Sequence, residues 1–320
     1  MKMNVFGPGR RRAIFLFSLN PKRSMAQNDS RPYDIVVFGA TGASARIPMP
    51  RQHRIPFFGT DDRTPHSLSY PSYPSYPSTG YTGSKIFEEL LLSGFIENEG
   101  GSVALAGRRL DSLLEVKDRV AHETLYPGVA PQIGLIEANT AEDESLHRMA
   151  RQARVCINAV GPFRFHGRQV VKACIEEGCS YLDICGEPEF IEAIELEYDD
   201  DAREKGVFVA SACGFDSVPV DVGNALVRGA FPPKRCCSVE TFIELHSGPS
   251  GLVLHYPTYA SAVHGLGSVE KLRAIRKALR AKKTAEVEKS ARPLPMRRTG
   301  SYAKEVGKYV IPFIGADGWY

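Results

Sequence analysis

The sequence predicts an α/β fold, in which a doubly wound parallel sheet is followed by a second, incomplete α+β domain. Three observations lead to this. Short apolar runs alternate with amphipathic stretches from residue 33 to 212. A glycine-rich turn follows the first apolar run. The alternation stops after residue 212. With 320 residues, 43% of them hydrophobic, the chain can bury one large or two ordinary cores.

The first strand and its turn occupy residues 33–42, which read Tyr-Asp-Ile-Val-Val-Phe-Gly-Ala-Thr-Gly. A third glycine that opens a helix does not follow directly but comes at Tyr81-Thr82-Gly83. If residues 43–80 loop out, Gly39, Gly42 and Gly83 fill the three positions of a Rossmann-like dinucleotide turn. Thr-Gly occurs at both 41–42 and 79–80, so the turn could continue from Ala40 to Thr79 or from Gly42 to Tyr81.

The insert at 43–80 contains a Tyr/Pro/Ser repeat of three residues at 69–78. Proline at every third position disfavours helices and strand ladders and favours polyproline II. One interpretation is a disordered Pro/Tyr/Ser insert. The other is a regulatory lid or a partner-binding segment. In either case the insert would emerge beside the phosphate site, where it could weaken cofactor binding.

The following elements alternate regularly. We expect helices at 85–96, 111–121 (capped by Asp111), 143–152, 169–177 and 188–205, and strands at 101–106, 132–138, 154–160, 180–184 and 207–211. Strands joined by helices form parallel βαβ units. The pattern therefore predicts an NAD(P)-binding Rossmann-like domain over residues 33–212.

The pattern changes in the last third of the chain. We expect a helix at 217–227, a half-buried strand at 238–246, a basic helix at 268–283 and an edge strand at 309–314 that contains Pro312. One long strand with fragments cannot close a sheet that has a buried face. Residues 213–320 are therefore predicted to be a partial substrate or C-terminal domain.

The net charge of +3 is spread unevenly. Residues 1–32 carry seven Lys/Arg and one acid, residues 33–269 carry 20 and 31, and residues 270–320 carry 13 and five. The excess of acidic residues at 33–269 argues against a nucleic-acid partner for this part of the chain. The basic segments at the two ends would either contact an anionic membrane surface or be solvated tails. The basic N-terminal extension, 1–32, has the charge of a mitochondrial presequence, or Met25 is the true start.

The seven cysteines show no zinc-ligand spacing. They are interpreted as reduced, mostly buried thiols of an intracellular protein, and no metal site is predicted.

Cofactor contacts are predicted at the turns that follow three strands. Two arginines after the second strand suit the 2′-phosphate of NADP better than the ribose hydroxyl of NAD, although NAD is not excluded. The predicted contacts are Gly39, Ala40, Thr41, Gly42, Tyr81, Thr82, Gly83, Gly107, Arg108, Arg109, Ala159, Val160, Gly161 and Pro162.

The catalytic group stays unassigned. Tyr181, Asp183 and Glu187 end the fifth strand, where they could position substrate or move protons. A structural role for each is the preferred interpretation, with Glu187 as a charge at a helix N-terminus. His246 and His255 have no identifiable partner and are also interpreted as structural.

Several motifs in order resemble the saccharopine dehydrogenase-like oxidoreductases, a group that includes the trans-acting enoyl reductases. They are Tyr33–Gly42 joined to 81–83, then 106–109, 158–163, 181–187, 213–219 and 245–251. The chain departs from the family pattern in the insert at 43–80 and in a second domain that is truncated after Ala316.

The resemblance implies an NADP-dependent oxidoreductase, with enoyl reduction in lipid or glycolipid metabolism as the better-motivated chemistry. It implies a small-molecule or lipid-linked substrate and peripheral association with mitochondria, lipid droplets or membranes. The insert and the truncation could impair this form. The alternative is a non-catalytic Rossmann-fold protein at a lipid-droplet or membrane surface. The oligomeric state is not predicted.

Overall fold

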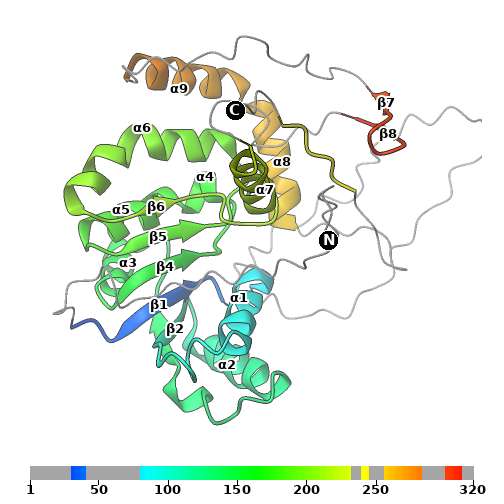
Figure 1. Cartoon of the computed structure of the whole chain (residues 1–320). Helices are drawn as coiled ribbons and strands as arrows, with labels where there is room; N and C mark the ends of the chain where they lie inside the picture. The colour runs from blue at the N-terminus through cyan, green and yellow to red at the C-terminus, as the bar shows by residue number, and fades with distance from the viewer. Residues whose placement is uncertain (1–29, 41–79, 232–238, 245–255, 283–299, 312–320) are drawn as a thin grey trace, which may run out of the picture. The chain divides into compact units, whose positions relative to one another are not determined.

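The computed structural model describes residues 30–40, 80–231, 239–244, 256–282 and 300–311 (Figure 1). Its centre is a six-stranded sheet in the order β3-β2-β1-β4-β5-β6, in which every neighbouring pair is parallel. The strands are β1 (Tyr33–Phe38), β2 (Val103–Gly107), β3 (Gly134–Glu137), β4 (Ala153–Asn158), β5 (Ser180–Asp183) and β6 (Val209–Ala210). This is the doubly wound, Rossmann-like α/β fold that the sequence predicts.

The strand order reverses between β1 and β4, which are neighbours in the sheet although β2 and β3 separate them in the chain. Phe38 at the end of β1 is in register with Ala106 of β2 and with Asn158 at the end of β4, and Asn158 is in register with Asp183 of β5. The carboxyl ends of these strands therefore lie level at one edge, where ligands bind in open α/β sheets.

Helices cover both faces of the sheet (Figure 1). They are α1 (Tyr81–Leu92), α2 (Leu110–Glu123), α3 (Asp143–Ala150), α4 (Phe163–His166), α5 (Arg168–Glu176) and α6 (Pro188–Lys205), with a 3-10 turn, η1, at Ala130–Gln132. Alternate residues of β1 point to opposite sides, so that Ile35 and Val37 join the core with α1 and α2. Val36 and Phe38 join the core with α3, α5 and α6.

Helix α1 occupies residues 81–92 instead of the expected 85–96. It begins directly after Gly80 and ends at Leu92, with Ser93 as its C-cap residue, because the next residue, Gly94, has φ of 76°. This left-handed conformation, which glycine adopts readily, ends a right-handed helix. The short helix α4 was not expected from the sequence.

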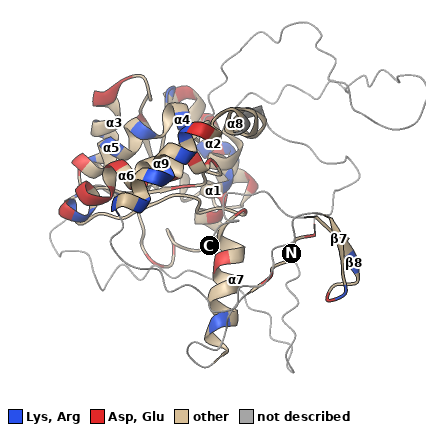
Figure 2. Ribbon diagram, turned by 90° about the horizontal axis from the view of Figure 1, so that it is seen from above, with Lys and Arg blue, Asp and Glu red and all other residues tan. Residues whose placement is uncertain are grey.

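Three further helices follow the sheet. They are α7 (Val218–Gly229), α8 (Tyr256–Gly267) and α9 (Val269–Lys282), and α8 was not expected. Helix α9 packs against α6, and Figure 2 shows its basic residues near the acidic residues of α6. The ion pairs between the two helices are Lys271–Glu189, Arg276–Glu192 and Lys282–Asp200.

The predicted strand at 238–246 is wrong for the residues that the structure describes. Residues 239–244 adopt neither strand nor helix. The two described sheets do not include this segment. The expected edge strand corresponds to β8 (Lys308–Val310), which pairs antiparallel with β7 (Ser301–Ala303).

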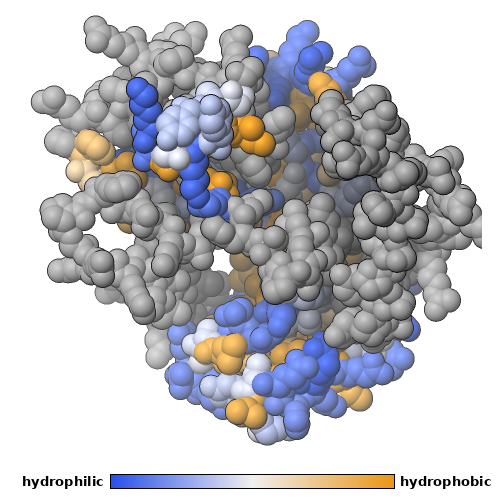
Figure 3. Space-filling view, turned by 90° about the vertical axis from the view of Figure 1, so that its right-hand side faces the viewer, coloured by the Kyte–Doolittle hydropathy of each residue, from blue (hydrophilic) through white to orange (hydrophobic). Residues whose placement is uncertain are grey.

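Several other expectations fall outside the described residues: the N-terminal segment up to residue 29, the insert except Gly80, and His246, His255 and Pro312. Of the cysteines in the described part, four are buried, Cys156, Cys174, Cys179 and Cys185, whereas Cys213 is exposed. No helix in that part is long and apolar enough to span a bilayer. Around α1 and α2, at the bottom of Figure 3, apolar and polar residues are interspersed.

Candidate cofactor site

The two halves of the split glycine motif meet at the end of β1. A Cβ atom on Gly83, in the first turn of α1, would lie 2.7 Å from the Cα atom of Ala40 and 2.7 Å from the carbonyl oxygen of Gly39. Such distances are too short for any side chain, so only glycine lets the helix approach the strand this closely. The first turn of α1 therefore lies directly against the end of β1.

Gly39 is constrained on its other side. Its φ is 94°, and a Cβ atom there would lie 2.8 Å from Cγ2 of Val160 and 3.1 Å from the carbonyl carbon of Ala159. The turn after β1 thus touches both α1 and the loop that follows β4. Thr41 and Gly42 lie outside the described residues.

The N-terminus of α1 lies against this turn, and its first turn carries no negative charge. Its N-cap residue is Gly80, no side chain caps it, and the first turn, which includes Tyr81 and Thr82, holds no acidic residue. A helix N-terminus carries the positive end of the helix dipole and presents backbone N–H groups. The arrangement suits a phosphate group beside Gly39.

The turn after β2 brings two cations to the same edge of the sheet. Gly107 is buried, whereas Arg108 and Arg109 are exposed. Helix α2 starts at Leu110 with Arg109 as its N-cap residue, so the expectation that Asp111 caps this helix is wrong. Oδ1 of Asp111 instead accepts a hydrogen bond of 2.8 Å from the N–H of Ser112.

Arg108 lies close enough to His166 of α4 to affect its ionisation. Burial lowers the pKa of the His166 imidazole, and the positive charge of Arg108 lowers it further. Nδ1 of His166 lies 3.3 Å from Oγ1 of Thr140, in the turn that follows β3. Sequence reasoning missed His166, because nothing in its local pattern indicates that three separate turns converge there.

The loop after β4 contains Ala159, Val160, Gly161 and Pro162, and its Gly161-Pro162 peptide bond is cis. The backbone N–H of Ala159 donates to the carbonyl oxygen of Phe38 (2.9 Å), which joins the loop to the end of β1. The N–H of Val160 donates to Oδ1 of the buried Asn158 (2.9 Å), whose Nδ2 donates to the hydroxyl of Tyr181 (3.1 Å). The sheet interior therefore fixes the start of this loop.

Asp183 completes that network and is buried. Its Oδ2 accepts hydrogen bonds from the hydroxyls of Tyr181 (2.8 Å) and Ser211 (3.0 Å). Its Oδ1 accepts from the backbone N–H groups of Cys185 (2.9 Å) and Ala212 (3.0 Å). Burial raises the pKa of both Tyr181 and Asp183. Both side chains are engaged in holding the turns after β5 and β6, in agreement with a structural role.

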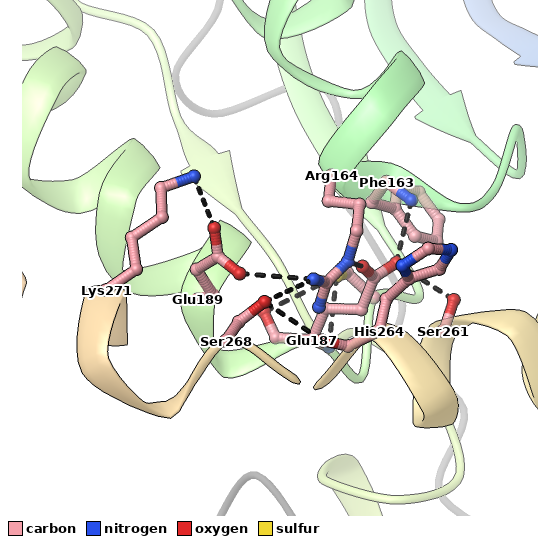
Figure 4. Close-up of polar contacts among 9 residues, drawn as sticks. Phe163, Arg164, Glu187, Glu189, Ser261, His264, Ser268 and Lys271 are labelled. Carbon is pink, nitrogen blue, oxygen red and sulfur yellow. Dashed lines mark hydrogen bonds and ion pairs between the residues drawn. The ribbon is translucent and has the colours of Figure 1, made fainter. Parts of the chain in front are cut away.

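Glu187, at the N-cap position of α6, does not cap that helix with its side chain. The buried carboxylate points at α4 instead (Figure 4). Oε1 accepts hydrogen bonds from the N–H of Phe163 (2.8 Å) and from Oγ of Ser261 in α8 (3.0 Å). Oε2 accepts from Nε of Arg164 (2.6 Å). Glu187 thus lies at the N-terminus of its own helix, as expected, while its carboxylate makes hydrogen bonds to α4 and α8.

Arg164 extends this cluster toward α9. Its Nη1 donates to Oε2 of Glu189 (3.1 Å) and to Oγ of Ser268 (2.8 Å), and Lys271 of α9 pairs with the other oxygen of Glu189 (Figure 4). Nη2 of Arg164 is buried without a hydrogen-bond partner. Sequence reasoning also missed Arg164 and Ser261, because their partner Glu187 lies 23 and 74 positions away.

Among the residues that the structure describes, no group of three or more His, Cys, Asp or Glu side chains could hold a metal ion. The polar groups gathered at the sheet edge suit a phosphate-bearing organic cofactor, with backbone N–H groups and arginines as the donors.

Comparison with known proteins agrees with this geometry. The family model for the saccharopine dehydrogenase NADP binding domain matches residues 78–209. The chain is 36% identical over 241 residues to a saccharopine dehydrogenase-like oxidoreductase of Mus musculus. The matched stretch makes up 75% of this chain and 55% of the relative. The chain is 40% identical over 243 residues, with the same coverage, to a lipid droplet localized protein of Caenorhabditis elegans.

Two further relatives are matched over shorter stretches. A probable mitochondrial saccharopine dehydrogenase-like oxidoreductase of Arabidopsis thaliana is 36% identical over 204 residues, 62% of this chain and 44% of the relative. A putative trans-acting enoyl reductase of Mycobacterium tuberculosis is 33% identical over 147 residues, 45% of this chain and 32% of the relative. The chain thus spans about 55% of the length of the first relatives it matches.

Proposed function

Because this chain belongs to the saccharopine dehydrogenase-like oxidoreductase family through its NADP-binding domain, we propose that the sheet edge described above holds NADP and that the protein transfers hydride between this cofactor and a substrate. The observation that carries the proposal is the approach of Gly83 to Gly39 and Ala40. It joins strand, turn and helix N-terminus into the arrangement that binds a pyrophosphate, in spite of the insert.

In this proposal three turns contact the cofactor. Residues 39–42 and 81–83 surround the pyrophosphate, 107–109 approach the adenosine ribose, and 159–162 line the middle of the cofactor. Preference for NADP over NAD is assigned to Arg108 and Arg109, because guanidinium groups match the oxygens of a 2′-phosphate. The residues from 33 to 212 would form the cofactor domain, 1–32 a basic extension, and 213–320 part of a substrate domain.

The substrate side of the proposal rests on similarity. The putative trans-acting enoyl reductase of Mycobacterium tuberculosis and the lipid droplet localized protein of Caenorhabditis elegans favour a lipid-linked enoyl group as the hydride acceptor. The same names, with the mitochondrial relative, favour a place at a lipid droplet or mitochondrion.

The residues of the chain contribute binding and orientation to this chemistry, while bound NADP would supply the hydride. The turn at Gly39 and the N-terminus of α1 would hold the phosphates, and the loop after β4 would contact the cofactor beside them. Tyr181 and Asp183 support that loop through Asn158 and are not assigned to proton transfer.

The test is a fluorescence titration of the full chain with NADPH, together with Gly83→Ala and Gly229→Ala. A Cβ atom at Gly83 would lie 2.7 Å from backbone, whereas one at Gly229, near the end of α7, would meet nothing within 4 Å. We expect the wild type and Gly229→Ala to bind alike and Gly83→Ala to bind at least roughly tenfold more weakly, since a helix shift misplaces several phosphate contacts.

Equal binding of NADPH by all three proteins would mean that the glycine turn does not contact the cofactor. A wild type that does not bind NADPH would favour the alternative of a Rossmann-fold protein without turnover.

A further inference from the structure

The loop after β4 is held at its two ends by different parts of the molecule. At its start, Asn158 ties Val160 to the interior of the sheet through Tyr181. At its end, Glu187 accepts the N–H of Phe163, the first residue after Pro162. Only the second anchor reaches beyond the sheet, because the same oxygen of Glu187 also accepts the hydroxyl of Ser261 in α8.

We propose that Glu187 is a positioning residue that couples the cofactor loop to α8 and α9, so that NADP affinity depends on how these helices dock. This inference rests on the proposed cofactor site. The loop touches Gly39 through Val160 and Ala159, so a shift at its end displaces the backbone that lies against Gly39. One carboxylate thus receives hydrogen bonds from the loop, from Arg164 and from α8, and Arg164 continues to Ser268 beside α9 (Figure 4).

The three contacts of Glu187 cannot be kept by an amide. In Glu187→Gln one side-chain oxygen becomes an NH₂ group, which faces either Nε of Arg164 or the N–H of Phe163, and both of these are donors. The substitution removes a charge-assisted hydrogen bond in a buried place while it keeps the size of the side chain. It therefore perturbs the position of the loop more than the packing around it.

Glu192 of α6 provides a matched control. Its carboxylate accepts hydrogen bonds of 2.6–2.9 Å from Arg276 of α9, so it also joins α6 to α9, but among the described residues it makes no hydrogen bond to the loop. Glu192→Gln loosens the same helix pair without a direct effect on the cofactor loop. If Glu187 only stabilised the fold, Glu187→Gln and Glu192→Gln would have the same affinity for NADPH.

The experiment measures the Kd for NADPH and the melting temperature of the wild type, Glu187→Gln, Glu192→Gln and Ser261→Ala. We expect Glu187→Gln to weaken NADPH binding roughly tenfold, as the loss of one hydrogen bond to a charged group predicts. Glu192→Gln should lower the melting temperature but keep the wild-type Kd. Ser261→Ala, which leaves the hydrogen bond to Phe163 intact, should weaken binding by roughly threefold.

The inference is overturned if Glu187→Gln and Glu192→Gln give the same Kd, or if Ser261→Ala binds as the wild type does. Should Glu187→Gln fail to fold, Ser261→Ala against Glu192→Gln decides the question. A wild type that does not bind NADPH would instead defeat the proposed cofactor site, which separates the two failures.

Discussion

Arg108 is one of the two residues to which the proposed preference for NADP over NAD is assigned. It is exposed at the end of β2, and its charge reaches His166. A 2′-phosphate at this place would accept hydrogen bonds from the guanidinium group. Each such bond would contribute about 1.5–3 kcal/mol to the binding free energy. The 2′-hydroxyl of NAD cannot use the charge in the same way, so the effect of Arg108 should be confined to NADP.

We expect Arg108→Ala to raise the Kd for NADPH by roughly ten- to hundredfold and to leave the Kd for NADH within about twofold. Arg148→Ala, an exposed arginine in the last turn of α3, is the control, and it should change neither value. Titration of both nucleotides into each protein gives the answer. Equal losses for NADPH and NADH would assign Arg108 to a part of the cofactor that the two nucleotides share.

The same substitution has a consequence that needs no cofactor. Because the positive charge of Arg108 is one of the two causes that lower the pKa of His166, Arg108→Ala should raise this pKa toward its ordinary value, while burial still holds it below. An NMR titration of the imidazole measures it. An unchanged pKa would show that the two side chains do not lie close together in solution.

At the scale of elements, α6 and α9 are joined by charge and not by a broad apolar seam. Leu279 is the one buried residue in α9 among those whose side chains are described. Burial acts to raise the pKa of Glu189, but hydrogen bonds from Lys271 and Ser268 outweigh it and hold the pKa below its ordinary value. Hydrogen bonding to Lys282 and its charge likewise lower the pKa of Asp200.

A lowered folded-state pKa means that the carboxylate contributes stability above the unfolded pKa and loses it as the pH falls through the folded value. Glu189→Gln should therefore lower the free energy of unfolding by about 1–3 kcal/mol at pH 7, and this deficit should shrink below about pH 4.3. Urea unfolding of both proteins between pH 7 and pH 3 tests this. Glu204→Gln, at an exposed position of the same helix, serves as the control, and a deficit that is independent of pH would contradict the argument.

At the scale of the whole molecule, the sheet was predictable and its connections to the last helices were not. The unbroken apolar run Ile35-Val36-Val37 indicates a strand buried on both faces, and the order of strands and helices then leaves few topologies. Local patterns carry no information on contacts such as Glu187 with Ser261, which depend on folded geometry. For the same reason alternation alone was misleading at 239–244, where no described partner strand is present.

Some residues of the candidate site could be predicted from the sequence, whereas others could not. The glycines were predictable because a tight turn and a close helix restrict the residue type, which leaves a mark on the sequence. Arg164 and His166 left no such mark, since arginine and histidine fit a short exposed helix equally well. Burial and partners, which only the fold supplies, distinguish them.

The fold also predicts how the chain responds when residues 43–80 are removed. The shortened chain reads Gly39-Ala40-Thr41-Gly42-Tyr81, so that Gly42 takes the place of Gly80 before α1. Three peptide units span up to about 10 Å, which is enough because Ala40 already touches Gly83. We expect a cooperative unfolding transition and a gain of about 2 kcal/mol in stability, since each doubling of loop length costs about 0.6 kcal/mol.

The matching expectation for function is that the shortened chain binds NADPH at least as tightly as the full chain. The proposed phosphate turn includes Gly39, Ala40 and Gly83, and the deletion spares all three. Thermal unfolding and NADPH titration of the two chains side by side measure both quantities. A shortened chain that is less stable, or that binds NADPH more weakly, would mean that residues 43–80 contribute contacts of their own, and the glycine turn would then not be sufficient for the site.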